Sequence, residues 1–174
     1  MSVPRWARKA SLTLHVASSV GWMGAVLVYL ALGVAGVVSD DTALVAAVYL
    51  TMNWAAWVVL VPLALASLVT GVVQSMVSPW GLVRHYWVVV KLVATLVATG
   101  VLLAYTQTLA TFADVAARVP LSGADLGVLR SPSVIVHTLG ALVLLLGALV
   151  LAVYKPRGLT RHGQRAAAST ASRG

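Results

Sequence analysis

Four long apolar stretches constrain the fold of this chain more than any other feature. They lie near residues 12–37, 44–77, 85–110 and 133–154. A helix of about 20 apolar residues crosses the hydrocarbon core of a bilayer, and each stretch reaches that length. Apolar residues surround the whole circumference of these stretches, whereas each helix of a soluble four-helix protein keeps a polar face. The sequence therefore predicts an all-α, polytopic membrane protein with four transmembrane helices in an up-down bundle.

The charged residues between these stretches are sorted by sign. The acidic residues lie in the first and third connections: Asp40, Asp41, Asp114 and Asp125. The N-terminus, the second connection and the C-terminus carry only basic residues: Arg5, Arg8, Lys9, Arg84, Lys155, Arg157, Arg161, Arg165 and Arg173. Because Lys and Arg accumulate in cytoplasmic segments, both termini and the middle connection are predicted to be cytoplasmic. We expect a multi-pass protein of a bacterial-type cytoplasmic (inner) membrane.

The predicted domain organisation is one four-helix transmembrane domain and a short tail. The domain covers residues 1–157, with its first apolar run retained as a helix because the run is too long for a signal peptide. Residues 158–174 are polar, small and basic, which predicts a disordered cytoplasmic tail on anionic lipid headgroups. The net charge of +8 does not indicate a nucleic-acid partner, since the basic residues flank apolar spans and form no face of a soluble domain. The expected partner is the lipid bilayer.

Several local patterns refine this picture. Pro62 falls within the second span and predicts a kink. Ser67, Thr70 and Gln74 form a polar line, which is typical of interhelical hydrogen bonds and less often of a ligand cavity. Ser78-Pro-Trp-Gly81 predicts a tight turn, and the connection over 112–131 has room for a short helix.

Small residues recur every four positions on the first helix, at Ala17, Gly21 and Ala25. Such spacing allows two helices to approach closely. Packing within the bundle is the simpler interpretation, and a homo-oligomer through this face is the alternative.

Ionisable residues inside the apolar spans are the candidate functional groups. His15 and Lys91 lie one to two turns above the same end of the first and third helices, so the rise of about 1.5 Å per residue places them at similar depth. They are predicted to share a site, with Ser18, Ser19 and Gln74 as supporting polar groups. His137 enters from the opposite side and is predicted to lie too far away to share a ligand with His15.

Structural interpretations of the same residues remain open. Lys91 can extend its side chain to the interface, and His85 lies at the boundary where side chains meet headgroups. His137 can form a hydrogen bond to a neighbouring helix. The chain has no cysteine, which excludes thiolate metal sites and disulfides and leaves imidazole as the main ligand for a metal or a haem. His15 is the candidate metal ligand, and His85 could bracket a planar cofactor with it.

Short motifs around these residues resemble known families. His15-Val-Ala-Ser-Ser-Val-Gly-Trp-Met-Gly24 resembles the first-helix pattern His-x6-Trp-x-Gly of the copper-resistance D family of bacterial membrane proteins. The membrane-bound protoporphyrinogen oxidase family has a similar opening, in which the His is taken as a haem ligand. Its third helix carries Trp-x-His-x-Lys-Leu; here Trp87, Lys91 and Leu92 match, and Val89 replaces the His.

The longest likeness runs through Ser78-Pro-Trp-Gly-Leu-Val-Arg-His-Tyr-Trp-Val-Val-Val-Lys91 and resembles an uncharacterised family of predicted four-helix bacterial integral membrane proteins. The resemblances together imply a four-helix membrane architecture and a haem b or metal site. In that hypothesis His15 is the axial ligand, His85 a second ligand, and Lys91 a cationic partner for a propionate.

The sequence disfavours two other functions. Copper handling is disfavoured because the methionines, Met1, Met23, Met52 and Met76, form no evident cluster with His15. Transport is disfavoured because the chain has no internal repeat. The main alternative to cofactor binding is a non-catalytic structural or partner-binding bundle. No reaction is assigned from the sequence.

Overall fold

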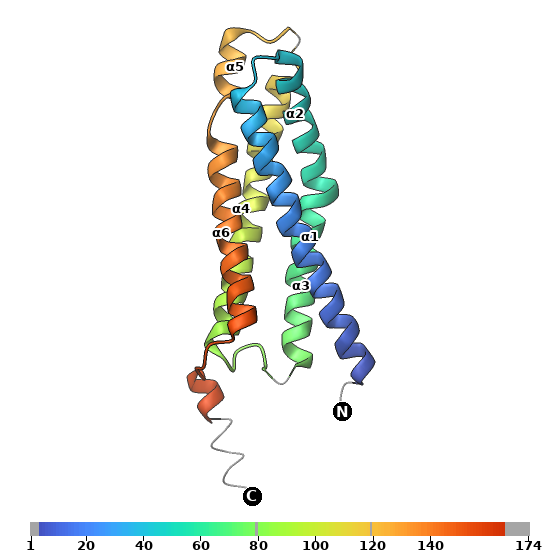
Figure 1. The fold of residues 1–174 in the computed structure, drawn as a ribbon, viewed down its shortest axis with the longest axis vertical. Coiled ribbons are helices and arrows are strands. Elements are labelled where there is room, and N and C mark those ends of the chain that lie inside the picture. Colours follow the sequence, from blue (N-terminus) through green and yellow to red (C-terminus); the bar gives the residue numbers. More distant parts are fainter. Residues whose placement is uncertain (1–3, 79, 119, 166–174) are drawn as a thin grey trace, which may run out of the picture.

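The computed structural model describes residues 4–78, 80–118 and 120–165, which form a long helical bundle (Figure 1). The elements in chain order are α1 (Arg5–Val38), α2 (Thr42–Ala55), the π-helix η1 (Ala56–Leu60), α3 (Val61–Val77), α4 (Tyr86–Ala116), α5 (Gly123–Leu129) and α6 (Ser133–Tyr154). No β-strand occurs in the described part of the chain. Four helical segments are long and apolar enough to cross a membrane. The prediction of an all-α membrane bundle is confirmed at this level.

The helix boundaries differ from the predicted ones at two places. The first helix begins at Arg5, because Pro4 precedes it directly and no helix breaker lies between Arg5 and the apolar run. The third helix continues to Ala116, six residues past its predicted end at residue 110. The last helix spans Ser133–Tyr154, as predicted.

The four spans are arranged like the corners of a square. α1 packs against α2, α3 and α6, and α4 packs against the same three helices. α1 and α4 therefore occupy opposite corners and face each other across the interior. The described termini, residues 4 and 165, lie at the same end of the bundle (Figure 1). We call it the basic end, and the end that carries Asp40, Asp41, Asp114 and Asp125 the acidic end.

The second span is interrupted where the sequence predicts a kink. Pro62 has no N–H and cannot bond to the carbonyl four residues earlier. The preceding turn is the π-helix η1, in which the Val61 N–H donates to the Ala56 carbonyl. A π-turn carries one extra residue, so the helix continues past Pro62 although one backbone hydrogen bond is missing.

The acidic half of the bundle is closely packed. The hydroxyl of Tyr29 donates to the Met52 carbonyl at 2.5 Å, which joins α1 to α2. The hydroxyl of Tyr49 donates to the Leu129 carbonyl and so holds α5 over the end of the bundle. The ring of Tyr49 also packs edge-on against Phe112, with centroids 5.4 Å apart. These contacts join α1, α2, α4 and α5 in one core.

α5 is the short helix expected in the third connection. Its N-terminus carries a capping box, in which Ser122 and Asp125 satisfy each other's backbone N–H groups. Arg118 pairs with Asp125 at 3.2 Å, and Arg130 pairs with Asp40 at 3.1 Å. These are the ion pairs of the described residues, and both lie at the acidic end.

Small residues mediate the contacts between helices, though only in part those predicted. A Cβ on Gly33 would lie 2.7 Å from Val134 Cγ1, so α1 and α6 approach as closely there as a glycine allows. Gly21 faces Leu63 of α3, at 3.3 Å from a built Cβ. Ala17 is exposed and Ala25 is partly buried. Gly21 thus packs within the bundle, whereas the proposed contact to a second copy stays a prediction.

Residues Gly158–Arg165, the first part of the predicted tail, pack against the loop before α4. The Tyr86 N–H donates to the Gly158 carbonyl at 3.3 Å, and the Thr160 hydroxyl donates to the Val83 carbonyl at 2.6 Å. Gly163 fits tightly under this loop, because a Cβ there would lie 2.4 Å from the Arg84 carbonyl oxygen. The backbone groups of Val83 and Tyr86 are the partners in these hydrogen bonds, and the amino-acid composition of the tail does not reveal them. Residues 166–174 of the predicted tail, including Arg173, lie outside the described residues.

The predicted turn after α3 is supported at Gly81, whose φ of +66° is a conformation that favours glycine. Pro79 of the same motif lies outside the described residues.

Candidate functional site

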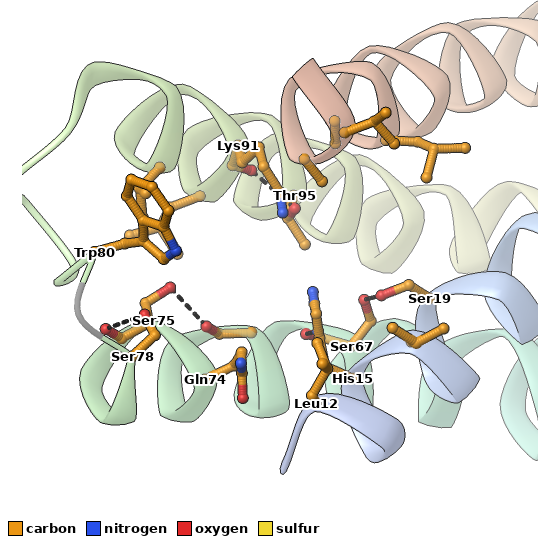
Figure 2. Close-up of a pocket in the computed structure, with 18 of the residues that line it drawn as sticks. Leu12, His15, Ser19, Ser67, Gln74, Ser75, Ser78, Trp80, Lys91 and Thr95 are labelled. Atoms are coloured by element: carbon orange, nitrogen blue, oxygen red, sulfur yellow. Dashed lines mark hydrogen bonds between the residues drawn. The ribbon is translucent and has the colours of Figure 1, made fainter. Parts of the chain in front are cut away.

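A cavity of about 770 Å³ occupies the basic half of the bundle. All four spans contribute to its wall, through residues of α1, α3, α4 and α6. Its middle is mostly apolar, with Met23, Leu92, Leu145 and Ala148 among the lining residues. Figure 2 shows polar side chains on two facing sides of this space.

His15 projects from α1 into the cavity (Figure 2). Its Nδ1 lies 3.2 Å from the Ser67 carbonyl oxygen and 3.3 Å from Thr70 Oγ1, both on α3. A carbonyl oxygen only accepts, so we assign the proton of the neutral ring to Nδ1. Nε2 is then left with a free lone pair. In other proteins, a hydrogen bond to one ring nitrogen orients a histidine whose other nitrogen binds a metal in the same way.

Gly71 makes room for this ring on α3. A Cβ at Gly71 would lie 3.0 Å from His15 Cε1, so a larger residue would force the imidazole to move. Gly71 was not identified from the sequence as part of the site. Its position one turn after Ser67, within the predicted polar line, was the available signal.

In the polar line of α3, Ser67 and Thr70 form the predicted interhelical hydrogen bonds, and Ser67 and Gln74 line the cavity. Ser19 Oγ lies 2.7 Å from Ser67 Oγ, and Ser18 Oγ lies 3.3 Å from Thr70 Oγ1. Ser18 is buried and does not line the cavity, whereas Ser19 does. Gln74 also lines the cavity, and its buried Oε1 has no hydrogen-bond partner among the described residues. Because this oxygen is buried, Gln74 does not present it to the open space, and Figure 2 shows the amide turned away from the cavity.

Lys91 lies on the opposite wall, on α4 (Figure 2). Its Nζ is 5.8 Å from the centre of the Trp87 ring, within the range of a cation–π contact. His15 and Lys91 thus line one cavity from opposite corners of the bundle.

Further cations surround the mouth of the cavity. Arg5, Arg8 and Lys9 of α1 line it together with Lys155, which follows α6. No acidic residue is among the described residues that line it. Lys155 also lies 5.6 Å from the centre of the Trp80 ring, so the loop after α3 forms part of the same rim. The cavity consequently has an apolar middle and a positively charged end.

His85 does not line this cavity. Its Nδ1 lies 2.8 Å from the Trp80 carbonyl oxygen, and its ring packs edge-on against Trp80 with centroids 5.2 Å apart. The short loop before α4 holds the imidazole outside the bundle, beside Leu159. The structure does not bring His85 and His15 to opposite sides of one planar ligand.

His137 lies in the acidic half, away from His15 as expected. The sequence indicates a hydrogen bond from His137 to a neighbouring helix, but its Nδ1 lies 2.8 Å from the Ser133 carbonyl oxygen of its own helix. The neighbouring helix is contacted by stacking: the rings of His137 and Tyr105 are 4.1 Å apart. The side chain is exposed on the outer face of the bundle.

A metal cage is not formed by the described residues. No three His, Asp or other acidic side chains gather there in a metal-binding group. The methionines of the described chain are scattered: Met52 is buried in the acidic half, Met76 is 69% exposed, and Met23 lines the cavity.

Comparison with protein-family models, with curated proteins and with solved structures finds no match for this chain. Its function must therefore be inferred from the site.

Proposed function

We propose that this protein is a membrane-embedded cofactor-binding bundle that holds haem b in the cavity of its basic half, with His15 as an axial ligand. The observation that carries the proposal is the His15 imidazole, whose Nδ1 is fixed by α3 and whose ring faces the 770 Å³ cavity. A single oriented histidine is enough for a haem, because the porphyrin nitrogens supply the equatorial ligands and the protein needs to add only an axial one. A bare metal ion would need more protein ligands than this site offers.

The remaining wall matches the chemistry of a haem. Apolar side chains such as Leu92 and Leu145 suit the faces of the macrocycle. Lys91, on the wall opposite His15, can hold a propionate of the haem. A bound haem would supply one-electron redox chemistry, while the chain would orient the ring and exclude water.

The basic end is placed in the cytoplasm in this proposal. Arg5, Arg8, Lys9, Arg84 and Lys155 gather at that end, and cytoplasmic segments are the ones enriched in Lys and Arg. The site would then lie in the cytoplasmic half of a bacterial-type inner membrane.

The first test is the visible absorption spectrum of the protein purified in mild detergent from cells supplied with a haem precursor. We expect a Soret band, and α and β bands after reduction. His15→Ala should abolish these bands while the far-ultraviolet circular dichroism stays helical. His137→Ala is the matched control, because His137 is exposed in the other half, and it should keep the full haem content.

A colourless, folded and helical wild-type protein would refute the proposal and favour the alternative, a structural or partner-binding bundle.

If the wild-type protein binds haem, Lys91→Met separates a lysine that holds the ligand from one that only extends to the membrane interface. We expect the Met variant to lose haem affinity. Unchanged haem content and reduction potential would assign Lys91 to the interface alone.

A further inference from the structure

The cavity is open at its side, between α1 and α6. Leu12, Val16 and Val20 of α1 line it and are 49%, 50% and 55% exposed. Leu149 and Val153 of α6 also line it and are 45% and 66% exposed. Side chains that belong to a cavity wall and to the outer surface at once mark the rim of an opening. In a bilayer this opening faces the acyl chains of lipid.

The opening widens toward the basic end. Near the acidic end α1 and α6 touch, with Gly33 against Val134. Figure 1 shows the two helices diverging from there, with the N-terminal part of α1 well apart from the end of α6. The opening therefore has a closed, apolar end and a wide end near the membrane interface.

The wide end is positively charged, and its cations are not neutralised by the described residues. Arg5, Arg8 and Lys9 lie on the α1 side and Lys155 on the α6 side. The ion pairs of residues 4–78, 80–118 and 120–165 involve Arg118 and Arg130 instead, at the other end. Four cations around an apolar slot require negative charge from outside the chain to balance them.

We propose that this opening binds an acidic phospholipid of the surrounding bilayer. Its phosphate lies among Arg5, Arg8, Lys9 and Lys155, and one acyl chain lies in the slot between α1 and α6. The shape supports this occupant, because an amphiphile with one anionic end and an apolar body matches a slot that is charged only at its wide end. The bilayer presents such lipids directly to the opening, and a zwitterionic lipid offers the cations no net negative charge.

This lipid site goes beyond the proposed cofactor and does not depend on His15. The rim residues lie where the cavity opens to the membrane, whereas His15 lies on the cavity wall beside α3. The two proposals can therefore fail separately.

The test is native mass spectrometry of the protein released from nanodiscs that hold phosphatidylglycerol and phosphatidylcholine in equal amounts. We expect one retained phosphatidylglycerol per chain. The double variant Arg8→Gln/Lys155→Gln should reduce that adduct on the order of tenfold or more, since each cation near an anionic lipid contributes about 1 kcal/mol, or about fivefold. Equal retention of the two lipids by the wild-type protein would overturn the proposal.

The matched control is Arg157→Gln/Arg161→Gln. These arginines are exposed, follow α6 at the basic end of the bundle, and do not line the cavity. The control removes the same charge from the same interface, so it should keep the adduct. An equal loss in both double variants would mean a general attraction to headgroups and would overturn a specific site. Excess inorganic phosphate should leave the adduct intact, because it lacks the acyl chain; displacement by phosphate would also overturn the lipid assignment.

A second variant tests the slot without changing charge. Val16→Trp fills the rim and should lower phosphatidylglycerol retention several-fold, whereas Val28→Trp, on the same helix but outside the cavity wall, should not. Retention unchanged in Val16→Trp would refute the acyl-chain position. Loss of haem with retention of lipid in His15→Ala would confirm that the two sites are distinct.

Discussion

The acidic and basic halves of this bundle are built from the same four spans, yet they pack in different ways. In the acidic half, Tyr29 and Tyr49 donate to backbone carbonyls across helices, and α5 covers the end. In the basic half the helices separate around a cavity, and polar groups of α3 hold the ring of His15 from α1 beside it. One half serves mainly to fix the positions of the helices, and the other is free to hold a ligand.

The difference follows from the residues at the contacts. Gly33 and Gly36 let α1 approach α6 and the ring of Tyr49 in the acidic half. In the basic half the corresponding part of α1 carries Arg5, Arg8 and Lys9, whose mutual repulsion and hydration oppose close packing. Without a hydrophobic driving force between helices in lipid, such local contacts decide where a bundle closes.

The largest expected effect concerns the two ends themselves. The chain has no native cysteine, so single cysteines can be introduced at Gly127 of α5 and at Arg157. Both positions are exposed, and a side chain at Gly127 meets no neighbour within 4 Å. A membrane-impermeant maleimide added to intact cells should label position 127 and not position 157. The reverse pattern would contradict the placement of the basic end in the cytoplasm.

The next largest effect concerns packing. Leu109→Ala, at a residue that is 1% exposed in the acidic half, should destabilise the bundle by about 2–4 kcal/mol because the neighbours cannot fill the space. Leu149→Ala, at a cavity-lining residue that is 45% exposed, should cost less than about 1 kcal/mol. Equilibrium unfolding in mixed detergent and SDS micelles measures both. Similar losses would abolish the distinction between the halves.

Glycines of α1 offer a smaller and closely matched comparison. Gly33→Ala should destabilise by about 1–3 kcal/mol, because its Cβ would lie 2.7 Å from Val134. Gly24→Ala meets nothing within 4 Å and should be neutral or stabilise the helix by up to about 1 kcal/mol. The same unfolding assay measures the change in the free energy of unfolding for both variants. A stabilising Gly33→Ala would show that α1 and α6 are less tightly packed than described.

The smallest expected effect concerns the orientation of His15. Thr70→Val removes one partner of Nδ1 but keeps the Ser67 carbonyl, so haem retention should fall by less than about tenfold. Thr95→Val is the control, since Thr95 lines the cavity but its hydroxyl donates only to the carbonyl of Lys91 in its own helix. Haem titration of both apoproteins measures the difference. A larger loss in Thr95→Val would place the ligand nearer α4 than α1.

Much of the architecture could be predicted from the sequence, because it depends on local composition. The length of the apolar stretches identified four spans, and Pro62 marked the place where the second span is interrupted. The alternation of basic and acidic connections indicated which ends lie together. The site was predictable only in part: depth along the helices put His15 and Lys91 at one level, but the same reasoning also admitted His85.

The sequence by itself determined how many times the chain can cross a bilayer and where its charges fall, since both depend on residues close together in the chain. Only the tertiary structure decided that His15 turns toward Ser67 and Thr70, that His85 stays outside with Trp80, and that Gly158–Arg165 packs on the loop before α4. These outcomes depend on which faces of distant helices meet, and in an apolar chain the hydrophobic pattern around each helix is nearly uniform. Glycines and a few polar side chains then set the packing, and their partners are separated by 50 residues or more, as His15 and Ser67 are by 52.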